Sequence, residues 1–186
     1  MAGLLQLFRP HQYVACLADI DLAALRSNGF DSLMLDLDNT LLPWKSSDVP
    51  DSSREWIETA KQLGMKMCII SNTNYPKRLR KIALELDIPS IDRAIKPRRS
   101  GFERALKMLG SESACTVVIG DQLLTDICGG NLMGIYTILV KPMHNTEFIG
   151  TKVSRLVEMG ILALLRRRGE LGTKSGRIQS ETQDNK

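Results

Sequence analysis

Short apolar runs alternate with amphipathic segments along most of this chain. The apolar runs predict buried strands at residues 32–37, 65–71, 91–95, 115–120 and 134–140. The segments between them carry apolar residues at helical spacing, as Trp56, Ile57 and Ala60 do in the first. Strands that alternate with helices of this length are typical of a parallel sheet with right-handed crossovers. The sequence therefore predicts an α/β fold, a doubly wound parallel sheet of about five strands in a three-layer sandwich.

Length and composition indicate one globular domain. The 186 residues can bury one sizeable core, and 43% hydrophobic and 25% charged residues are ordinary for a soluble protein. We expect this domain over residues 1–168, closed by a helix at 151–168, and a disordered polar tail over 169–186. The four cysteines form no CxxC pair, and we find neither a secretory signal nor a long apolar span. These features favour a cytoplasmic location.

The first predicted strand ends in two carboxylates. Asp36 and Asp38 are one residue apart, so on an extended chain they project the same way. Two like charges this close are unfavourable unless a cation or a shared proton offsets them. A simple strand-ending turn is the alternative, and Asn39-Thr40 would suit it. Asp121, at the end of a later strand, favours a ligand site instead.

The other predicted strands also end in polar residues. Ser71-Asn72 follows the second strand, Lys96 the third, and Asp121 and Asp126 the fourth. In a doubly wound sheet, ligands bind beyond the carboxyl ends of the strands, so these side chains should converge. Hard oxygen ligands suit Mg²⁺, and a lysine with a hydroxyl suits a phosphate group. Singly they are weak signals: Ser71 could belong to a turn, Lys96 could be solvated, and Asp121 could cap a helix.

In this order, the segments resemble the four motifs of the haloacid dehalogenase-like (HAD) superfamily of aspartyl phosphatases. The matching segments are Asp36-Leu37-Asp38-Asn39-Thr40-Leu41, Ile70-Ser71-Asn72, Lys96 and Gly120-Asp121-Gln122-Leu123-Leu124-Thr125-Asp126. The resemblance covers roughly residues 32–140. It implies a HAD-like Rossmannoid fold and a Mg²⁺-dependent phosphomonoesterase that works through an aspartyl-phosphate intermediate.

The resemblance also implies roles for the acids. Asp36 would be the nucleophile, and Asp38 would protonate the leaving oxygen and then activate the hydrolytic water. Mg²⁺ would be held by the carboxylates of Asp36 and Asp121 and by the backbone carbonyl of Asp38. Asp126 would not contact the phosphate itself; it would orient either Lys96 or a water molecule bound to the metal.

The phosphate group itself would be bound by three further residues that match the motifs. These are Ser71, Asn72 and Lys96, which would contact the oxygens on which transition-state charge accumulates. The gaps at residues 41–65 and 71–96 each have room for one helix, so we expect no cap domain. A site without a lid is open to large substrates.

The flanking segments narrow the substrate class. Leu7-Phe8-Arg9-Pro10 and residues 145–152 look like the subclass IIIA branch that includes phosphatidylglycerophosphate phosphatases. That resemblance implies a phospholipid phosphomonoester as substrate, reached at an anionic membrane surface by a peripheral protein. Apolar residues near the N-terminus and a helix ending in Arg166-Arg167-Arg168 could make that contact. Alternatively, the helix packs on the sheet and its arginines face water.

Other functions remain open. A phosphatase of proteins or of nucleic-acid ends would use the same chemistry. The modest net charge of +4, with charges of both signs interspersed, argues against nucleic acid as a partner. A receiver-like phospho-acceptor module would also place an Asp beside Mg²⁺. In such a module, however, the acidic pair and the acceptor lie on different strands, whereas Asp36 and Asp38 share one.

Overall fold

The sheet has six parallel strands in the order β1-β6-β5-β2-β3-β4. The computed structural model describes residues 5–143 and 149–171. The strands are β1 (Gln12–Val14), β2 (Ser32–Leu35), β3 (Lys66–Ile70), β4 (Ser90–Ile91), β5 (Thr116–Gly120) and β6 (Tyr136–Val140). The chain runs from β2 outward to β3 and β4, then returns to β5 on the other side of β2. Strand order therefore reverses between β2 and β5, as the predicted doubly wound fold requires.

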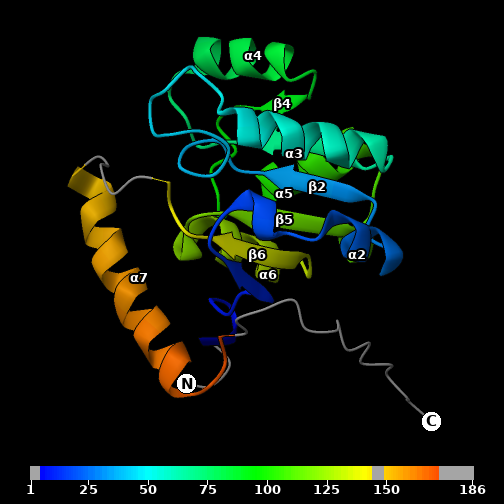
Figure 1. Ribbon diagram of the computed structural model, residues 1–186. Helices are drawn as coiled ribbons and strands as arrows, with labels where there is room; N and C mark the ends of the chain where they lie inside the picture. The colour runs from blue at the N-terminus through cyan, green and yellow to red at the C-terminus, as the bar shows by residue number, and fades with distance from the viewer. Residues whose placement is uncertain (1–4, 144–148, 172–186) are drawn as a thin grey trace.

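Helices cover both faces of the sheet (Figure 1). They are α2 (Leu22–Ser27), α3 (Asp51–Gln62), α4 (Pro76–Glu85), α5 (Arg99–Leu109), α6 (Cys128–Leu132) and α7 (Ile149–Arg167). The 3₁₀-helices η1 (Leu17–Asp19) and η2 (Ser113–Cys115) and the π-helix η3 (Leu123–Ile127) complete the connections. One helix separates β2 from β3 and one separates β3 from β4, consistent with the expected lack of a cap domain.

Strand β2 shows how the two cores form. Its side chains alternate between the faces of the sheet, as they must on an extended chain. Leu33 and Leu35 pack into the core that includes Ile57 of α3, whereas Met34 packs into the core around Phe102 of α5. All four residues of β2 are buried, because helices cover it on both sides. Burial on both faces is also why the strand reads as a continuous apolar run.

Two strands differ from the sequence prediction. The edge strand β1 was not predicted, because its three residues contain no apolar run; it pairs with β6. The strand predicted at 91–95 is reduced to the two residues of β4. Arg93 and Ile95 have φ angles of 46° and 56°, a left-handed conformation that ends the extended chain.

Some predictions concern residues that the structure does not describe. The N-terminal residues 1–4, the flanking residues 144–148 and most of the predicted tail, 172–186, lie outside the described residues. The domain limit at residue 168 therefore stays a prediction. Among the described helices, none is long and apolar enough to cross a bilayer.

Candidate active site

The site lies at the carboxyl end of β2, beside the point where strand order reverses. The backbone N–H of Asp36 donates to the carbonyl of Ile119 on β5 at 2.9 Å, so the sheet fixes its position. The chain then turns at Asn39, whose φ is 66°, a left-handed conformation that Asn tolerates better than most residues. The N–H of Asn39 donates to the carbonyl of Leu42 at 2.8 Å, which closes the turn and leaves Asp38 at its start.

Lys96 is the centre of a buried ionic cluster. Its Nζ lies 2.5 Å from Oδ1 of Asp36 and 2.6 Å from Oδ1 of Asp126, and it donates to the carbonyl of Ile70 at 3.0 Å. These contacts match the three donors of an ammonium group. The side chain is only 2% exposed, so Lys96 is not a solvated surface charge. The structure thus places Lys96, which matches the third motif, in direct contact with the carboxylate of Asp36, which matches the first.

Burial and neighbouring charges shift the pKa values in this cluster. Desolvation acts to lower the pKa of Lys96, but the carboxylates of Asp126 and Asp36 together raise it above its ordinary value. Burial raises the pKa of Asp36 to about 7; Lys96 opposes this shift, and Asp126 and Asp38 add to it. Lys96 therefore stays an ammonium group, and Asp36 lies where a further cation would favour its ionised form.

Three carboxylates approach one another at this point. Oxygens of Asp36, Asp121 and Asp126 all lie within 4.8 Å of one another, close enough to share one cation. Asp126 is also engaged elsewhere: Oδ1 accepts from Lys96, and Oδ2 accepts from the N–H of Gln122 at 3.1 Å. Both oxygens of Asp126 thus accept from protein donors, and one of them holds Lys96. Asp36 and Asp121 complete the group of carboxylates that could hold a hard cation. The donor set fits Mg²⁺.

Gly120 makes room for this arrangement at the end of β5. A Cβ at Gly120 would lie 2.3 Å from Cγ of Asp126, well inside contact distance. Any larger residue would displace the Asp126 carboxylate and, with it, the counterion of Lys96. The glycine that opens the fourth motif is thus needed for close packing of the site.

The second motif contributes a hydroxyl and an amide. Oγ of Ser71 accepts from the N–H of Thr73 at 3.1 Å and lines the site pocket. Asn72 holds the backbone of Lys96 on both sides: Oδ1 accepts from its N–H at 2.8 Å, and Nδ2 donates to its carbonyl at 3.0 Å. The side chain of Asn72 thus positions the backbone of Lys96.

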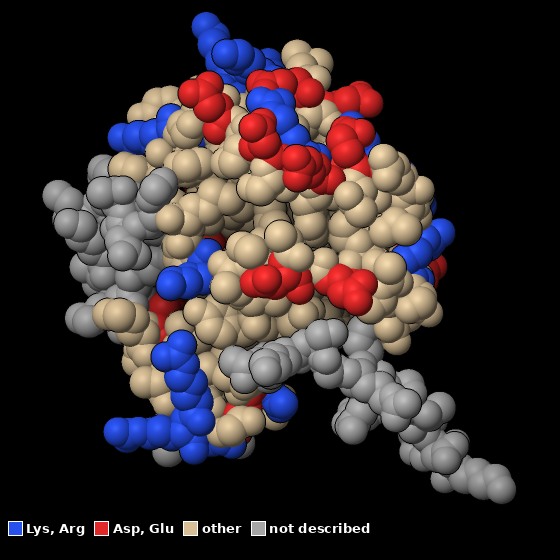
Figure 2. Space-filling model, in the orientation of Figure 1, with Lys and Arg blue, Asp and Glu red and all other residues tan. Residues whose placement is uncertain are grey.

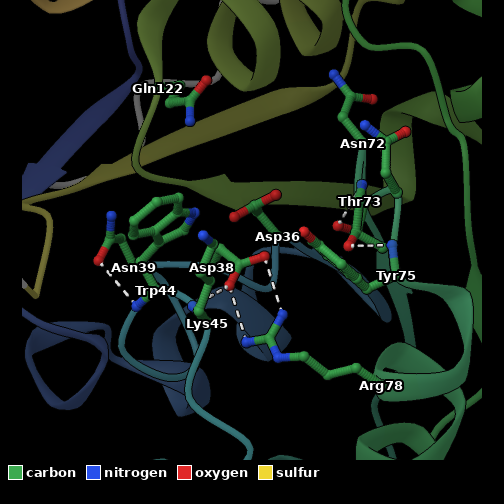
Figure 3. A pocket seen from close by; sticks show the side chains of 12 residues that line it. Asp36, Asp38, Asn39, Trp44, Lys45, Asn72, Thr73, Tyr75, Arg78 and Gln122 are labelled. Atoms are coloured by element: carbon green, nitrogen blue, oxygen red, sulfur yellow. Dashed lines mark hydrogen bonds and ion pairs between the residues drawn. The ribbon is translucent and has the colours of Figure 1, made fainter. Parts of the chain in front are cut away.

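A pocket of about 390 Å³ opens over Asp36 and Asp38 (Figure 3). The residues predicted from the motifs that line it are Asp36, Asp38, Ser71 and Asn72, and those that sequence reasoning missed include Trp44, Lys45, Tyr75, Arg78 and Gln122. The most consequential of the missed residues is Arg78, whose guanidinium pairs with both oxygens of Asp38. Its position on a helix facing the site carries no local sequence signal.

Comparisons with known proteins identify the family and the fold. A family model described as HAD-hydrolase-like matches residues 94–142. The probable phosphatase YqeG of Bacillus subtilis is 37% identical over 164 residues, which are 88% of this chain and 95% of that protein. A crystal structure of a haloacid dehalogenase-like hydrolase from Brucella suis, 10% identical, has a TM-score of 0.51 over 69% of this chain and 93% of its own. The family match and the phosphatase relative define a phosphoric monoester hydrolase.

A second relative is more specific in its name. Phosphatidylglycerophosphate phosphatase 1 of Arabidopsis thaliana is 31% identical over 172 residues, 87% of this chain but 48% of that protein. The chain thus spans about half the length of that relative. The chain belongs to the HAD superfamily of phosphatases and resembles phosphatidylglycerophosphate phosphatases. A receiver-like module without catalytic activity is therefore set aside.

Proposed function

We propose that this phosphatase uses Mg²⁺ and removes the terminal phosphate of phosphatidylglycerophosphate at a membrane surface. The observation that carries the chemistry is the Lys96 ammonium 2.5 Å from the Asp36 carboxylate, with Asp121 beside them. A phosphate in this position would meet a nucleophile, a cation and a hydroxyl at the same edge of the sheet.

Each residue has a defined step in the proposed reaction. Asp36 attacks phosphorus, the bond from phosphorus to the leaving oxygen breaks, and Asp38 gives that oxygen a proton. Asp38 then takes a proton from the water that cleaves the aspartyl phosphate and restores Asp36. Lys96 and Ser71 stabilise the charge on the phosphate oxygens. Mg²⁺, held by Asp36, Asp121 and the carbonyl of Asp38, would lessen the repulsion between the phosphate and Asp36.

Helix α7 supports a membrane-surface location. Its described exposed residues include Val157, Met159 and Leu164, which are 51%, 59% and 41% exposed, and it ends in exposed arginines. The helix packs on η3 through a side between these residues, where Glu158 accepts from the N–H of Leu124 at 3.2 Å and Leu165 is fully buried. At 3.6 residues per turn, Val157 and Leu164 lie along one flank of this contact and Met159 along the other. Exposed apolar side chains on a helix that ends in basic residues suit an anionic lipid surface. Figure 2 shows Lys and Arg side chains gathered toward the end of α7.

Helix α7 also lies near the site. In Figure 1 it runs along the left of the molecule, the side on which the loop after β2 emerges. A surface that holds α7 would then present lipid headgroups to the same side as the pocket. The N-terminal segment is a weaker candidate for membrane contact, since Nδ2 of Asn131 donates to the carbonyls of Leu7 and Arg9 at 2.9 and 3.0 Å and ties the segment down.

We expect neutralisation of the arginines that end α7 to weaken membrane binding. Replacement of Arg166, Arg167 and Arg168 by Gln should lower binding to anionic vesicles by roughly 10- to 100-fold, since each basic residue contributes about 1 kcal/mol near such a surface. Hydrolysis of vesicle-bound phosphatidylglycerophosphate should fall with it, while hydrolysis of a soluble aryl phosphate is retained. Vesicle sedimentation at two salt concentrations and phosphate release measure these effects.

The matched control neutralises three basic residues on α5, which lies on the far side of the sheet from α3. Replacement by Gln of Arg99, Arg104 and Lys107 removes the same amount of charge. This variant should bind vesicles nearly as well as the unmodified protein. Equal losses in both triple variants would mean that net charge, not α7, attracts the membrane. If the unmodified protein hydrolysed soluble phosphomonoesters faster than phosphatidylglycerophosphate, the protein would still be a phosphatase, but the proposed lipid substrate would be wrong.

A second expected result concerns the metal. Asp121→Asn should weaken Mg²⁺ binding by roughly 10- to 100-fold or more, because even residues that only orient metal ligands act on this scale. Isothermal titration calorimetry measures binding directly, and the Mg²⁺ dependence of phosphate release measures its consequence. Asp87→Asn is the control: Asp87 is exposed and has a φ of 52°, a conformation that Asn also adopts. Full activity of the unmodified protein in excess chelator would exclude the metal assignment.

A further inference from the structure

Arg78 of α4 extends into the site and forms an ion pair with Asp38. Nη2 lies 2.8 Å from Oδ1 of Asp38 and Nη1 lies 3.2 Å from Oδ2, and Nε donates to the carbonyl of Ser46 at 2.7 Å. The Arg78 side chain is 13% exposed and that of Asp38 is 24% exposed, so water screens the pair only in part. This is a forked, two-point contact that orders the loop after β2 (Figure 3).

The ion pair with Arg78 engages Asp38, the residue that must transfer the proton in the proposed reaction. Both carboxylate oxygens of Asp38 face the guanidinium, whereas transfer to a leaving oxygen requires that one of them face the substrate. If Arg78 withdrew, Asp38 would keep its bond from the backbone N–H of Lys45, at 3.1 Å to Oδ1. The carboxylate would thus remain anchored while one face became available. The guanidinium would then need another anion, because an uncompensated charge in a partly buried place is costly.

We propose that Arg78 is the receptor for a second, diester-linked phosphate of the substrate. Arrival of this anion draws the guanidinium from Asp38 to the substrate, which exchanges one forked anion contact for another and frees Asp38 for proton transfer. The proposal rests on the proposed function, since phosphatidylglycerophosphate carries a phosphodiester beside the phosphomonoester that is cleaved. A planar guanidinium suits the oxygens of a phosphodiester as it suits a carboxylate.

The surroundings of Arg78 favour this reading over a purely structural ion pair. Arg78 lines the pocket together with Lys45, whose ammonium lies 4.3 Å from the centre of the Trp44 ring. The pocket lining thus holds two cations and an aromatic ring together with Asp36 and Asp38. A substrate with one phosphate at Asp36 would present its next charged group to these residues. Specificity for a doubly charged substrate would then come from Arg78 and not from a cap domain.

The test compares substrates that differ in the second phosphate. Phosphate release is measured for short-chain, soluble phosphatidylglycerophosphate, for para-nitrophenyl phosphate and for a terminally phosphorylated oligonucleotide. The readout is the ratio of kcat/KM for the lipid headgroup to that for the aryl phosphate. Arg78→Met should lower this ratio roughly 10- to 100-fold, the effect of a lost charge-assisted hydrogen-bond pair. Arg78→Lys, which keeps the charge but not the fork, should lie between Arg78→Met and the unmodified protein.

Arg80→Met is the matched control, because Arg80 is exposed on the same helix and does not line the pocket; it should preserve the ratio. If the unmodified protein prefers the lipid headgroup and Arg78→Met and Arg78→Lys keep that preference, the proposed function stands and Arg78 is not the receptor. If the unmodified protein shows no such preference, both proposals fall. A higher kcat/KM for the oligonucleotide than for the lipid headgroup would overturn the proposed lipid substrate. The phosphodiester that Arg78 binds would then belong to a nucleic acid.

Discussion

Asp36→Asn is expected to abolish phosphate release while the fold remains intact. The amide has nearly the same shape as the carboxylate but cannot attack phosphorus to form the acyl phosphate. Loss of a nucleophile that acts with a neighbouring acid and base typically lowers kcat by about 10⁴- to 10⁶-fold. Lys96 keeps Asp126 and the carbonyl of Ile70 as partners in this variant, so its ammonium remains compensated. Single-turnover phosphate release with saturating Mg²⁺ measures the effect.

Two measurements separate loss of chemistry from loss of structure. The thermal unfolding curve of Asp36→Asn should remain cooperative, and the variant should still bind the phosphate analogue vanadate or the substrate itself. The exposed variant Asp87→Asn makes the same chemical change outside the site and should retain full activity. If Asp36→Asn retained more than a few per cent of the original rate of phosphate release, Asp36 could not be the nucleophile.

Lys96→Met is expected to destabilise the protein as well as inactivate it. The substitution leaves the carboxylates of Asp36 and Asp126 close together, with side chains that are 12% and 1% exposed, and removes the cation between them. Removal of one partner from a buried ion pair typically costs about 3–5 kcal/mol of the free energy of unfolding, because the remaining charge is uncompensated. Urea denaturation in the presence of chelator measures this cost at neutral pH.

Further variants test whether the buried charge is the cause. Adding Asp126→Asn to Lys96→Met should recover part of the lost stability, because one of the two uncompensated charges is then gone. The surface variant Lys66→Met is the matched control: Lys66 lies 3.8 Å from Asp31 with its side chain 47% exposed, and its loss should cost under about 1 kcal/mol. Equal stability of Lys96→Met and the unmodified protein would contradict a buried ionic centre.

The main features of the fold could be predicted because they are local. An apolar run such as residues 32–37 predicts a buried strand from its composition, and amphipathic spacing between such runs predicts the covering helices. The alternation of the two then restricts the chain to a parallel sheet. The edge strand β1 was missed for the same reason: its residues Gln12–Val14 carry no such run, and only pairing with β6 makes them a strand.

The acids and the lysine could be placed at one edge because parallel strands share their carboxyl ends. That rule brings Asp36, Lys96 and Asp121 together without knowledge of any distance. It does not say which pairs touch. The sequence could not predict that Asn72 holds the backbone of Lys96, or that Lys96 is shared between Asp36 and Asp126.

By itself, then, the sequence determined the order of strands β2 to β6, the helices between them and the residue types at the end of each of these strands. It could do so because hydrophobic periodicity and turn chemistry act over a few residues. Tertiary structure alone decided the partners. Arg78 and Asp38 are forty positions apart in sequence, and their forked contact exists because α4 packs where its side chain can reach the loop after β2. Burial of the Lys96 cluster likewise results from neighbouring strands and helices that exclude water, a property of the packed whole that no single segment encodes.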